Sequence, residues 1–453
     1  MSGSPFAVRG VIEGFYGNPW TQGQRLAMVD WLADHGMNTF VYGPKDDPLV
    51  RRFWRDAYEG EARGRLRQLA DRCAERGIDF VYAVGPGLTI RYSDVGDVGA
   101  LCAKLDSVLA LGATGVTVLL DDIPPILQHE ADLAAFKDIA DAHASLLRAV
   151  RGHLGDDARL IACPLVYHGA GDEPHIARLA AGIDPAIDLF WTGREICSTV
   201  LALEDARRFE VTASRPPLYW DNYPVNDVAM GWELHVGPYL GRAARLAEAS
   251  RGIIANPMEL FEASLIPLAT IAAYLANPAG YEPETAWRRA IAEVASADAD
   301  AFALVAENTR SSCLDDADAP TVTAALEAFL FGVDQGRGAA AAADLAGLAA
   351  RLASAVAQLL GPSPANAALV AECRPWIEAV GVGADAMAAM ARLAAENRLD
   401  LDARTVLRPY LVDLRRRRVR VFGDALDMTL SDLTDTHVRP GELTFAEPGG
   451  EQA

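Results

Sequence analysis

The sequence has few cysteines and no long apolar run. Its six cysteines stand singly, without the close spacing of a zinc site or the density of a disulfide-linked domain. The sequence contains no stretch of about 18 uninterrupted apolar residues, which would indicate a membrane span. The N-terminus has no basic segment leading into an apolar core, which would mark a secretory signal. We therefore expect a cytoplasmic protein with reduced thiols.

The chain also lacks an excess of positive charge. Its formal net charge is -21, and the averaged field of such a protein repels polyanions. This argues against a general binder of nucleic acid or anionic membranes. For the basic cluster Arg415–Arg418 we expect a solvated helix face that pairs with the protein's own carboxylates.

A phosphate-binding glycine turn is missing after the first predicted strand, because Gly10-Val-Ile-Glu-Gly14 does not have the G-x-G-x-x-G spacing. This argues against a doubly wound sheet. From Val8 to about Pro278, short apolar runs instead alternate with segments of helical periodicity. Eight such repeats predict a (β/α)₈ barrel, since parallel strands need crossover helices. The expected strands are Val8–Gly17, Asn38–Gly43, Ile78–Val84, Gly115–Leu120, Arg159–Cys163, Ile187–Thr192, Pro217–Trp220 and Gly252–Ala255.

Strands stop beyond about Glu284, and alanine, leucine and charged residues take over at helical spacing. We predict a catalytic barrel over 1–283, a helical bundle over 284–435 and a polar tail over 436–453. Bundles of this kind can form homodimers, but no long heptad repeat requires it. The expected helices in and after the barrel include 131–154, 239–249, 286–310, 319–333, 339–360, 364–380, 384–397 and 403–430.

The two carboxylates Asp121 and Asp122 end the fourth expected strand. The dipeptide alone has little specificity, because Asp46-Asp47, Asp156-Asp157 and Asp315-Asp316 are also present and such pairs often serve caps and turns. At the end of a buried barrel strand, however, acids are expected in a polar pocket. Successive strand residues point to opposite faces, so we predict a backbone bend that lets both acids reach one substrate.

Polar and aromatic residues follow the other expected strands as well. Carboxylates, amides, one lysine and several aromatic rings converge there, without a His/Cys cluster. This set suits a sugar, because aromatic rings stack on sugar faces and Asp, Asn and Lys satisfy hydroxyl groups.

The order of these motifs resembles glycoside hydrolase family 84. These are the β-N-acetylglucosaminidases that include the protein O-GlcNAcases, and the resemblance covers essentially the whole barrel. It implies a hydrolase without a cofactor or catalytic metal. The motifs that carry it are Glu13-Gly-Phe-Tyr-Gly-Asn-Pro-Trp20, Tyr42-Gly-Pro-Lys-Asp-Asp-Pro48, Leu120-Asp-Asp-Ile123, Trp220-Asp-Asn222 with Asn226-Asp227, and Asn256-Pro257.

The resemblance implies a retaining exo-glycosidase that removes O-linked N-acetylglucosamine (GlcNAc) with help from the substrate. The 2-acetamido oxygen attacks the anomeric carbon and forms an oxazoline, an exception to the two-carboxylate scheme. Asp121 is then expected to polarise the acetamide N–H. Asp122 is expected to act as general acid and then as general base, and repulsion between the two acids favours one shared proton.

The resemblance also implies binding roles for other residues. Tyr167 and Asn222 are expected to support the acetamide, and Trp220 to wall its pocket. The sugar hydroxyls are expected to be held by Gly14, Lys45, Asp227 and Asn256.

Three alternatives remain open from the sequence. The enzyme could hydrolyse free GlcNAc oligosaccharides or hyaluronan-type fragments instead of glycoproteins. A metal-dependent hydrolase could place Asp46, Asp121 and Asp122 around Mg²⁺. A non-catalytic scaffold that binds glycoproteins would keep Trp220 and Asp227 but would not need both strand-end acids.

Overall fold

The computed structural model describes residues 4–155, 158–316 and 319–435. By contacts the chain divides into two compact units, Met1–Gly231 with Pro238–Ala290, and Trp232–Gly237 with Ile291–Ala453. The contact boundary therefore falls a few residues after the expected one at 283/284. The short segment Trp232–Gly237, from within the expected barrel, groups with the helical unit. The expected tail, 436–453, lies outside the described residues.

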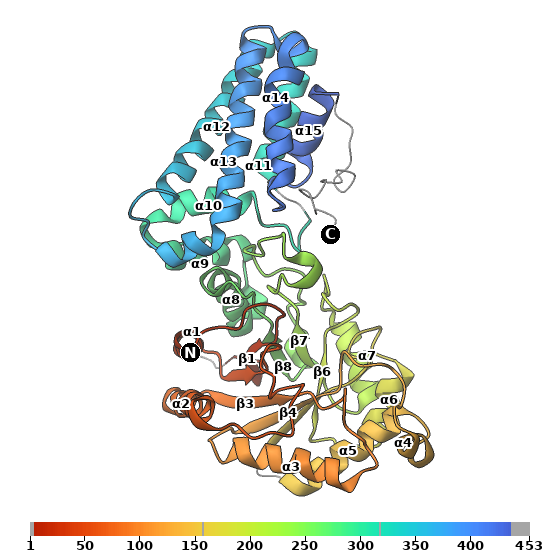
Figure 1. Ribbon diagram of the computed structural model, residues 1–453. Coiled ribbons are helices and arrows are strands. Elements are labelled where there is room, and N and C mark those ends of the chain that lie inside the picture. Colours follow the sequence, from red (N-terminus) through yellow and green to blue (C-terminus); the bar gives the residue numbers. More distant parts are fainter. Residues whose placement is uncertain (1–3, 156–157, 317–318, 436–453) are drawn as a thin grey trace, which may run out of the picture. The chain divides into compact units, whose positions relative to one another are not determined.

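The first unit contains a closed barrel of eight parallel strands in sequence order, as predicted (Figure 1). The first and last strands close it in parallel, with Val8 opposite Gly252. The side chains that the strands point into the barrel form a buried apolar core. Strands that are covered on both faces are apolar throughout. The strands are β1 (Val8–Glu13), β2 (Thr39–Tyr42), β3 (Asp79–Val84), β4 (Gly115–Leu119), β5 (Arg159–Cys163), β6 (Asp188–Trp191), β7 (Leu218–Asp221) and β8 (Gly252–Ala255).

Helices follow most of the strands and surround the barrel. The first is fixed by a capping box, in which the Thr21 side chain and Gln24 satisfy each other's backbone N–H groups. The helices are α1 (Gln22–Asp34), α2 (Gly60–Arg76), α3 (Val95–Leu109), α4 (Glu130–Ala135), α5 (Ile139–Leu154), α6 (Pro174–Ala181), α7 (Leu203–Ala213) and α8 (Phe261–Ala276).

Two helix predictions in this unit were wrong. The expected helix 131–154 is two helices, because Phe136 has an extended backbone and Asp138 caps a new helix with its side chain. The expected helix 239–249 contains only a short 3₁₀ turn, Leu246–Glu248. There, Arg242 pairs with Leu201 in a β-bridge and Gly241 has φ +75°, so the segment runs extended past the β6–α7 loop.

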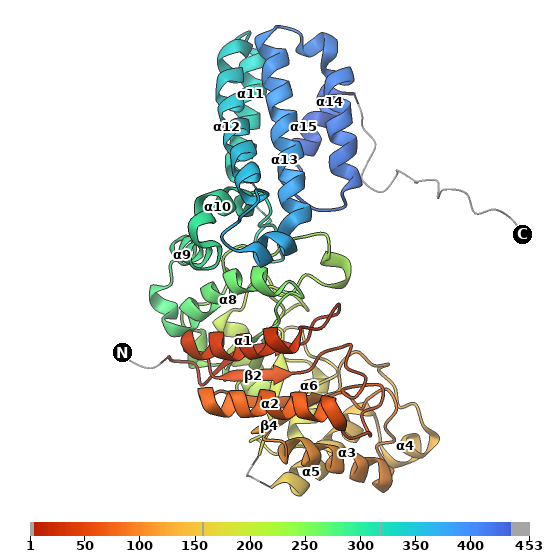
Figure 2. The same cartoon turned by 60° about the vertical axis from the view of Figure 1, so that its left-hand side comes forward.

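The second unit is a helical bundle, in which α12 and α13 pack along each other (Figure 2). One of its helices, α12, is long and apolar enough by composition to cross a membrane, but it packs against three other helices. The helices from the end of the barrel onward are α9 (Pro283–Ala295), α10 (Ala299–Glu307), α11 (Pro320–Asp334), α12 (Gly338–Leu359), α13 (Ala367–Ala395), α14 (Leu399–Arg416) and α15 (Ala425–Leu433).

Three boundaries in the bundle differ from the prediction. The expected helix 286–310 is α9, a 3₁₀ turn and α10, while 364–380 and 384–397 form the single helix α13, which tolerates Pro375 inside it. The expected helix 403–430 is broken between α14 and α15, where Arg418 and Phe422 have positive φ.

The basic cluster at the end of α14 pairs with carboxylates, in part as expected. Arg415 Nη2 lies 2.7 Å from Asp427 Oδ2, and Arg417 Nη2 lies 3.3 Å from Asp413 Oδ2.

Candidate active site

A cavity of about 680 Å³ opens among the loops that follow the carboxyl ends of the strands. Side chains from both ends of the barrel sequence reach it, since parallel strands present all their carboxyl ends at one face. All nine residues that the sequence singled out line this one cavity, namely Gly14, Lys45, Asp121, Asp122, Tyr167, Trp220, Asn222, Asp227 and Asn256. Their individual roles stay predictions.

The predicted backbone bend is present where β4 ends. Asp122 has φ +54°, a left-handed conformation that aspartate tolerates better than most residues. As a result both carboxylates reach the ammonium group of Lys45, with Nζ 3.8 Å from Asp121 Oδ2 and 3.6 Å from Asp122 Oδ2. The Asp121 side chain is 8% exposed and that of Asp122 34%, so the two acids differ in their access to water.

Burial and charge act in opposite directions on these groups. Burial raises the pKa of Asp121 above its usual range, while the Lys45 ammonium pulls it down and the Asp122 carboxylate raises it further. Burial alone lowers the pKa of Lys45, but the negative charge of Asp121 and its neighbours raises it overall. Lys45 is therefore a charged donor at neutral pH.

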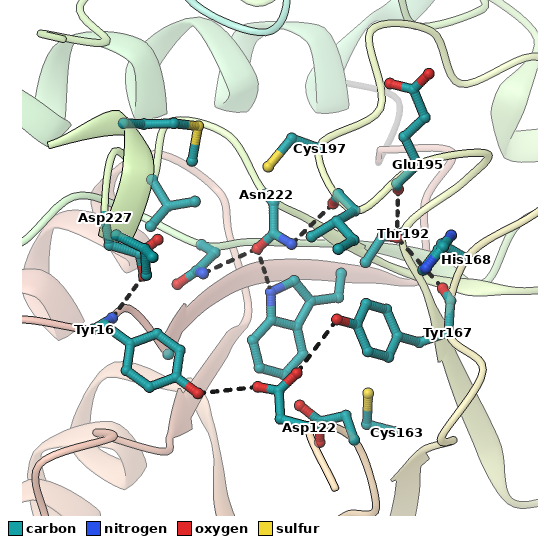
Figure 3. A pocket seen from close by; sticks show the side chains of 18 of the residues that line it. Tyr16, Asp122, Cys163, Tyr167, His168, Thr192, Glu195, Cys197, Asn222 and Asp227 are labelled. Carbon is teal, nitrogen blue, oxygen red and sulfur yellow. Dashed lines mark hydrogen bonds between the residues drawn. The ribbon is translucent and has the colours of Figure 1, made fainter. Parts of the chain in front are cut away.

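Two tyrosines flank Asp122 (Figure 3). The Tyr16 hydroxyl donates to Oδ2 at 3.0 Å and the Tyr167 hydroxyl to Oδ1 at 3.4 Å. Burial raises the pKa of Tyr167, so its phenol stays a neutral donor. The backbone N–H of Tyr16 also donates to Asp227 at 2.7 Å. Tyr16 thus hydrogen-bonds to two of the predicted site residues, Asp122 and Asp227. It lies in the sequence motif that follows β1, and this was the signal that could have identified it.

Two side chains that line the cavity each have a buried acceptor oxygen. Asp121 Oδ1 and Asn256 Oδ1 have no hydrogen-bond partner among the described residues. Such atoms are costly to bury unless something binds to them. The cavity therefore offers unused acceptors at its base.

The opposite wall is built from Trp220, Asn222 and Asn256. The indole N–H of Trp220 and the amide of Asn256 both donate to Asn222 Oδ1, at 2.8 and 3.0 Å, and Asn222 donates to the Ile196 carbonyl at 2.9 Å. Gly14 lets the Trp220 ring approach, because a Cβ there would lie 2.8 Å from the ring. These hydrogen bonds fix the orientation of the side chains in this wall.

Sequence reasoning missed part of the lining. The additional residues lie mainly on the loops after β6 and β7 and include apolar side chains that carry no motif of their own. They include Cys163, Ile196, Cys197 and Val228–Met230.

The alternative magnesium site is not assembled. Asp46 lines a different cavity, with Tyr42 and Arg25, and not the one that holds Asp121 and Asp122. Over the described ranges, no group of three or more His, Cys, Asp or Glu side chains has metal-ligand geometry.

A (β/α)₈ barrel with an aspartate pair, amides, a lysine and an indole around a cavity of this size has the architecture of a glycosidase. Comparison with known proteins identifies the family. The family model for β-N-acetylglucosaminidase matches residues 9–307, and the chain belongs to this family, glycoside hydrolase family 84.

Relatives and solved structures agree with this assignment. The protein O-GlcNAcases of Rattus norvegicus and Mus musculus are each 33% identical over 271 residues, which are 58% of this chain but only 29% of theirs. A mutant of the O-GlcNAc hydrolase of Thermobaculum terrenum is 31% identical, with a TM-score of 0.90 over 96% of this chain and 95% of that one. CpGH84B, at 23% identity and a TM-score of 0.85 over 95% and 77% of the two chains, shares the fold.

Proposed function

We propose that this chain is a retaining exo-β-N-acetylglucosaminidase that removes O-linked GlcNAc from proteins through an oxazoline intermediate. The observation that carries the proposal is the buried, unpartnered Oδ1 of Asp121 beside the more exposed acid Asp122. An acetamide N–H is the donor that such an oxygen lacks, and a neighbouring acid can serve the departing oxygen.

In the first step the acetamide oxygen of the substrate attacks the anomeric carbon. The glycosidic C–O bond breaks, and the departing oxygen takes the proton of Asp122. Asp121 accepts the acetamide N–H, which becomes more acidic as the oxazolinium ring forms. No enzyme nucleophile is needed, because the amide oxygen supplies the electron pair.

In the second step water attacks the anomeric carbon from the side that the aglycone left. Asp122, now a carboxylate, takes a proton from this water, and the oxazoline C–O bond breaks to restore the acetamide. Two inversions give net retention, and Asp122 is again protonated for the next cycle.

The raised pKa of Asp121 opposes the ionised form that this role requires, and substrate binding is proposed to offset it. Burial favours the neutral form of this acid in the empty cavity, but an N–H donated to its carboxylate favours the ionised form. Lys45, whose side chain is 5% exposed, acts in the same direction. Substrate binding and ionisation of Asp121 are therefore coupled.

The sugar hydroxyls have matching partners in the cavity. Asp227 is already oriented by the Tyr16 N–H, and Asn256 Oδ1 is an unused acceptor. With Lys45 as a donor, the cavity offers both acceptors and a charged donor to a neutral sugar.

The proposal is tested by following hydrolysis of an aryl N-acetyl-β-glucosaminide with NMR. We expect the β-anomer of GlcNAc as the first product. A first-formed α-anomer, or no hydrolysis, would contradict the proposal. A higher kcat/KM for a GlcNAc-modified peptide than for chitobiose is expected; the reverse order favours the oligosaccharide alternative.

A further inference from the structure

Arg51 contacts the acid–base group indirectly although it does not line the cavity. Its Nη1 donates to the Tyr16 hydroxyl oxygen at 3.2 Å, and its Nη2 lies 3.5 Å from the backbone carbonyl oxygen of Asp122. The same Tyr16 hydroxyl donates its proton to Asp122 Oδ2 at 3.0 Å. One guanidinium thus reaches both the backbone of Asp122 and the donor to its carboxyl group.

The loop that carries Arg51 is braced by the acid Asp47. Its Oδ2 accepts the hydroxyls of Tyr42 and Tyr58, at 2.8 and 2.6 Å, and its Oδ1 accepts the N–H of Leu49 at 2.9 Å. Because Asp47 is held at both oxygens, the chain that leads from β2 to Arg51 has a fixed course.

The end of β3 is shaped to receive the Arg51 side chain. The Gly85 N–H donates to the Val50 carbonyl at 2.8 Å, which ties the loop to this strand. A Cβ at Gly85 would lie 3.1 Å from Arg51 Cγ, so glycine leaves the room that the stem occupies. Arg51 is therefore held in place from two neighbouring strands.

Asp122 needs such support because its backbone is left-handed and its side chain is partly exposed. Residues other than glycine rarely adopt this conformation, and it persists where the surroundings hold it. A charged donor close to its carbonyl and a fixed hydroxyl at its carboxyl group supply that restraint.

We propose that Arg51 is a positioning residue for proton transfer by Asp122. It fixes the Tyr16 hydroxyl and the Asp122 carbonyl, so that the carboxyl group points at the departing oxygen. The inference rests on the proposed function of the site. Arg51 itself contacts neither the sugar nor the bond that breaks.

The dependence of rate on the leaving group tests this role. A glycoside of a strongly acidic phenol departs without protonation, whereas one of a weakly acidic phenol needs the general acid. We expect Arg51→Met to lower kcat/KM by about 10- to 100-fold for the weakly acidic phenol but by less than about threefold for the strongly acidic one. Arg51→Lys, which can reach one partner only, should recover part of the loss.

Arg52 provides the matched control. It is the adjacent arginine, its side chain is exposed, and it lies over the Phe53 ring at 5.1 Å. Arg52→Met should behave as the unmodified chain with every leaving group. A melting curve of each variant checks folding, and if Arg51→Met does not fold, Arg51→Lys gives the same comparison.

A loss that is equal for all leaving groups, or no loss, would overturn the positioning role of Arg51. The unmodified chain in the same assay tests the proposed function separately. If it does not cleave N-acetyl-β-glucosaminides, that function fails; if it does and the Arg51 variants show no change in leaving-group dependence, only this inference fails.

Discussion

The loops after β2 and β4 each carry an Asp-Asp pair, and the structure uses the two pairs differently. Asp47 accepts three hydrogen bonds, from Tyr42, Tyr58 and the Leu49 N–H, while its neighbour Asp46 is exposed. Asp121 is more deeply buried but keeps one oxygen without a partner among the described residues. Asp47 is fully bonded and builds its loop, whereas Asp121 keeps an acceptor that is available for chemistry.

This difference between Asp47 and Asp121 teaches that a buried acceptor without a partner, more than the type of residue, marks a place where a ligand can bind. A fully bonded carboxylate contributes to folding, whereas an unfilled buried acceptor costs stability that only a ligand recovers. Proteins commonly keep such costs at functional sites.

The largest expected effect comes from Asp122→Asn, which removes the general acid and base. We expect kcat/KM to fall about 1,000-fold on a glycoside with a weakly acidic leaving group, and much less on one with a strongly acidic leaving group. Steady-state kinetics on both substrates check this. Unchanged turnover would remove Asp122 from the mechanism.

Asp121→Asn should have the next largest effect. The amide cannot supply the negative charge that the acetamide N–H needs as the ring closes, so we expect about a 100-fold fall in kcat/KM. In contrast to Asp122→Asn, the loss should be similar for all leaving groups, because Asp121 acts on the acetamide. A loss confined to poor leaving groups would contradict the role given to Asp121.

Asp47→Asn should change stability more than chemistry. The amide is a poorer acceptor for three donors that now bind a carboxylate, so we expect the free energy of unfolding to fall by about 1 to 3 kcal/mol. Urea denaturation measures this. Asp46→Asn is the matched control and should stay within about 0.5 kcal/mol, since Asp46 is exposed. Equal effects of the two variants would contradict the structural role given to Asp47.

The smallest effect is a gain in melting temperature for Asp121→Asn at neutral pH. Burial raises the pKa of Asp121, so the folded protein binds its proton more tightly than the unfolded chain does. Ionising Asp121 therefore destabilises the fold progressively as pH rises above about 4, the ordinary aspartate range. The uncharged variant avoids this cost, by a few degrees.

A melting temperature of Asp121→Asn below that of the unmodified chain at pH 7 would contradict this prediction. The two proteins should converge below about pH 4, where both side chains at this position are neutral.

Much of the site was predictable because barrel geometry brings distant strand ends together. Once eight apolar strands are assigned, Asp121, Asn222 and Asn256 must meet at one face, and they do. A position after a strand does not by itself separate Asp46 from Asp121, because the sequence does not record which acids find hydrogen-bond partners.

Other features depend on tertiary context. Arg51 follows no strand directly, and only the folded loop places it near Tyr16. The break between α14 and α15 has a helix-like apolar pattern on both sides, whereas the break expected at 381–383, within α13, does not occur. In both places packing overrides local propensity.

The most direct test of substrate assistance compares two glycosides with the same leaving group, one of GlcNAc and one of glucose. The glucoside lacks the amide oxygen that is proposed to attack. We expect kcat for the glucoside to be lower by at least about 1,000-fold, the scale of a lost intramolecular reaction. Cleavage of both glycosides at similar rates would contradict the account.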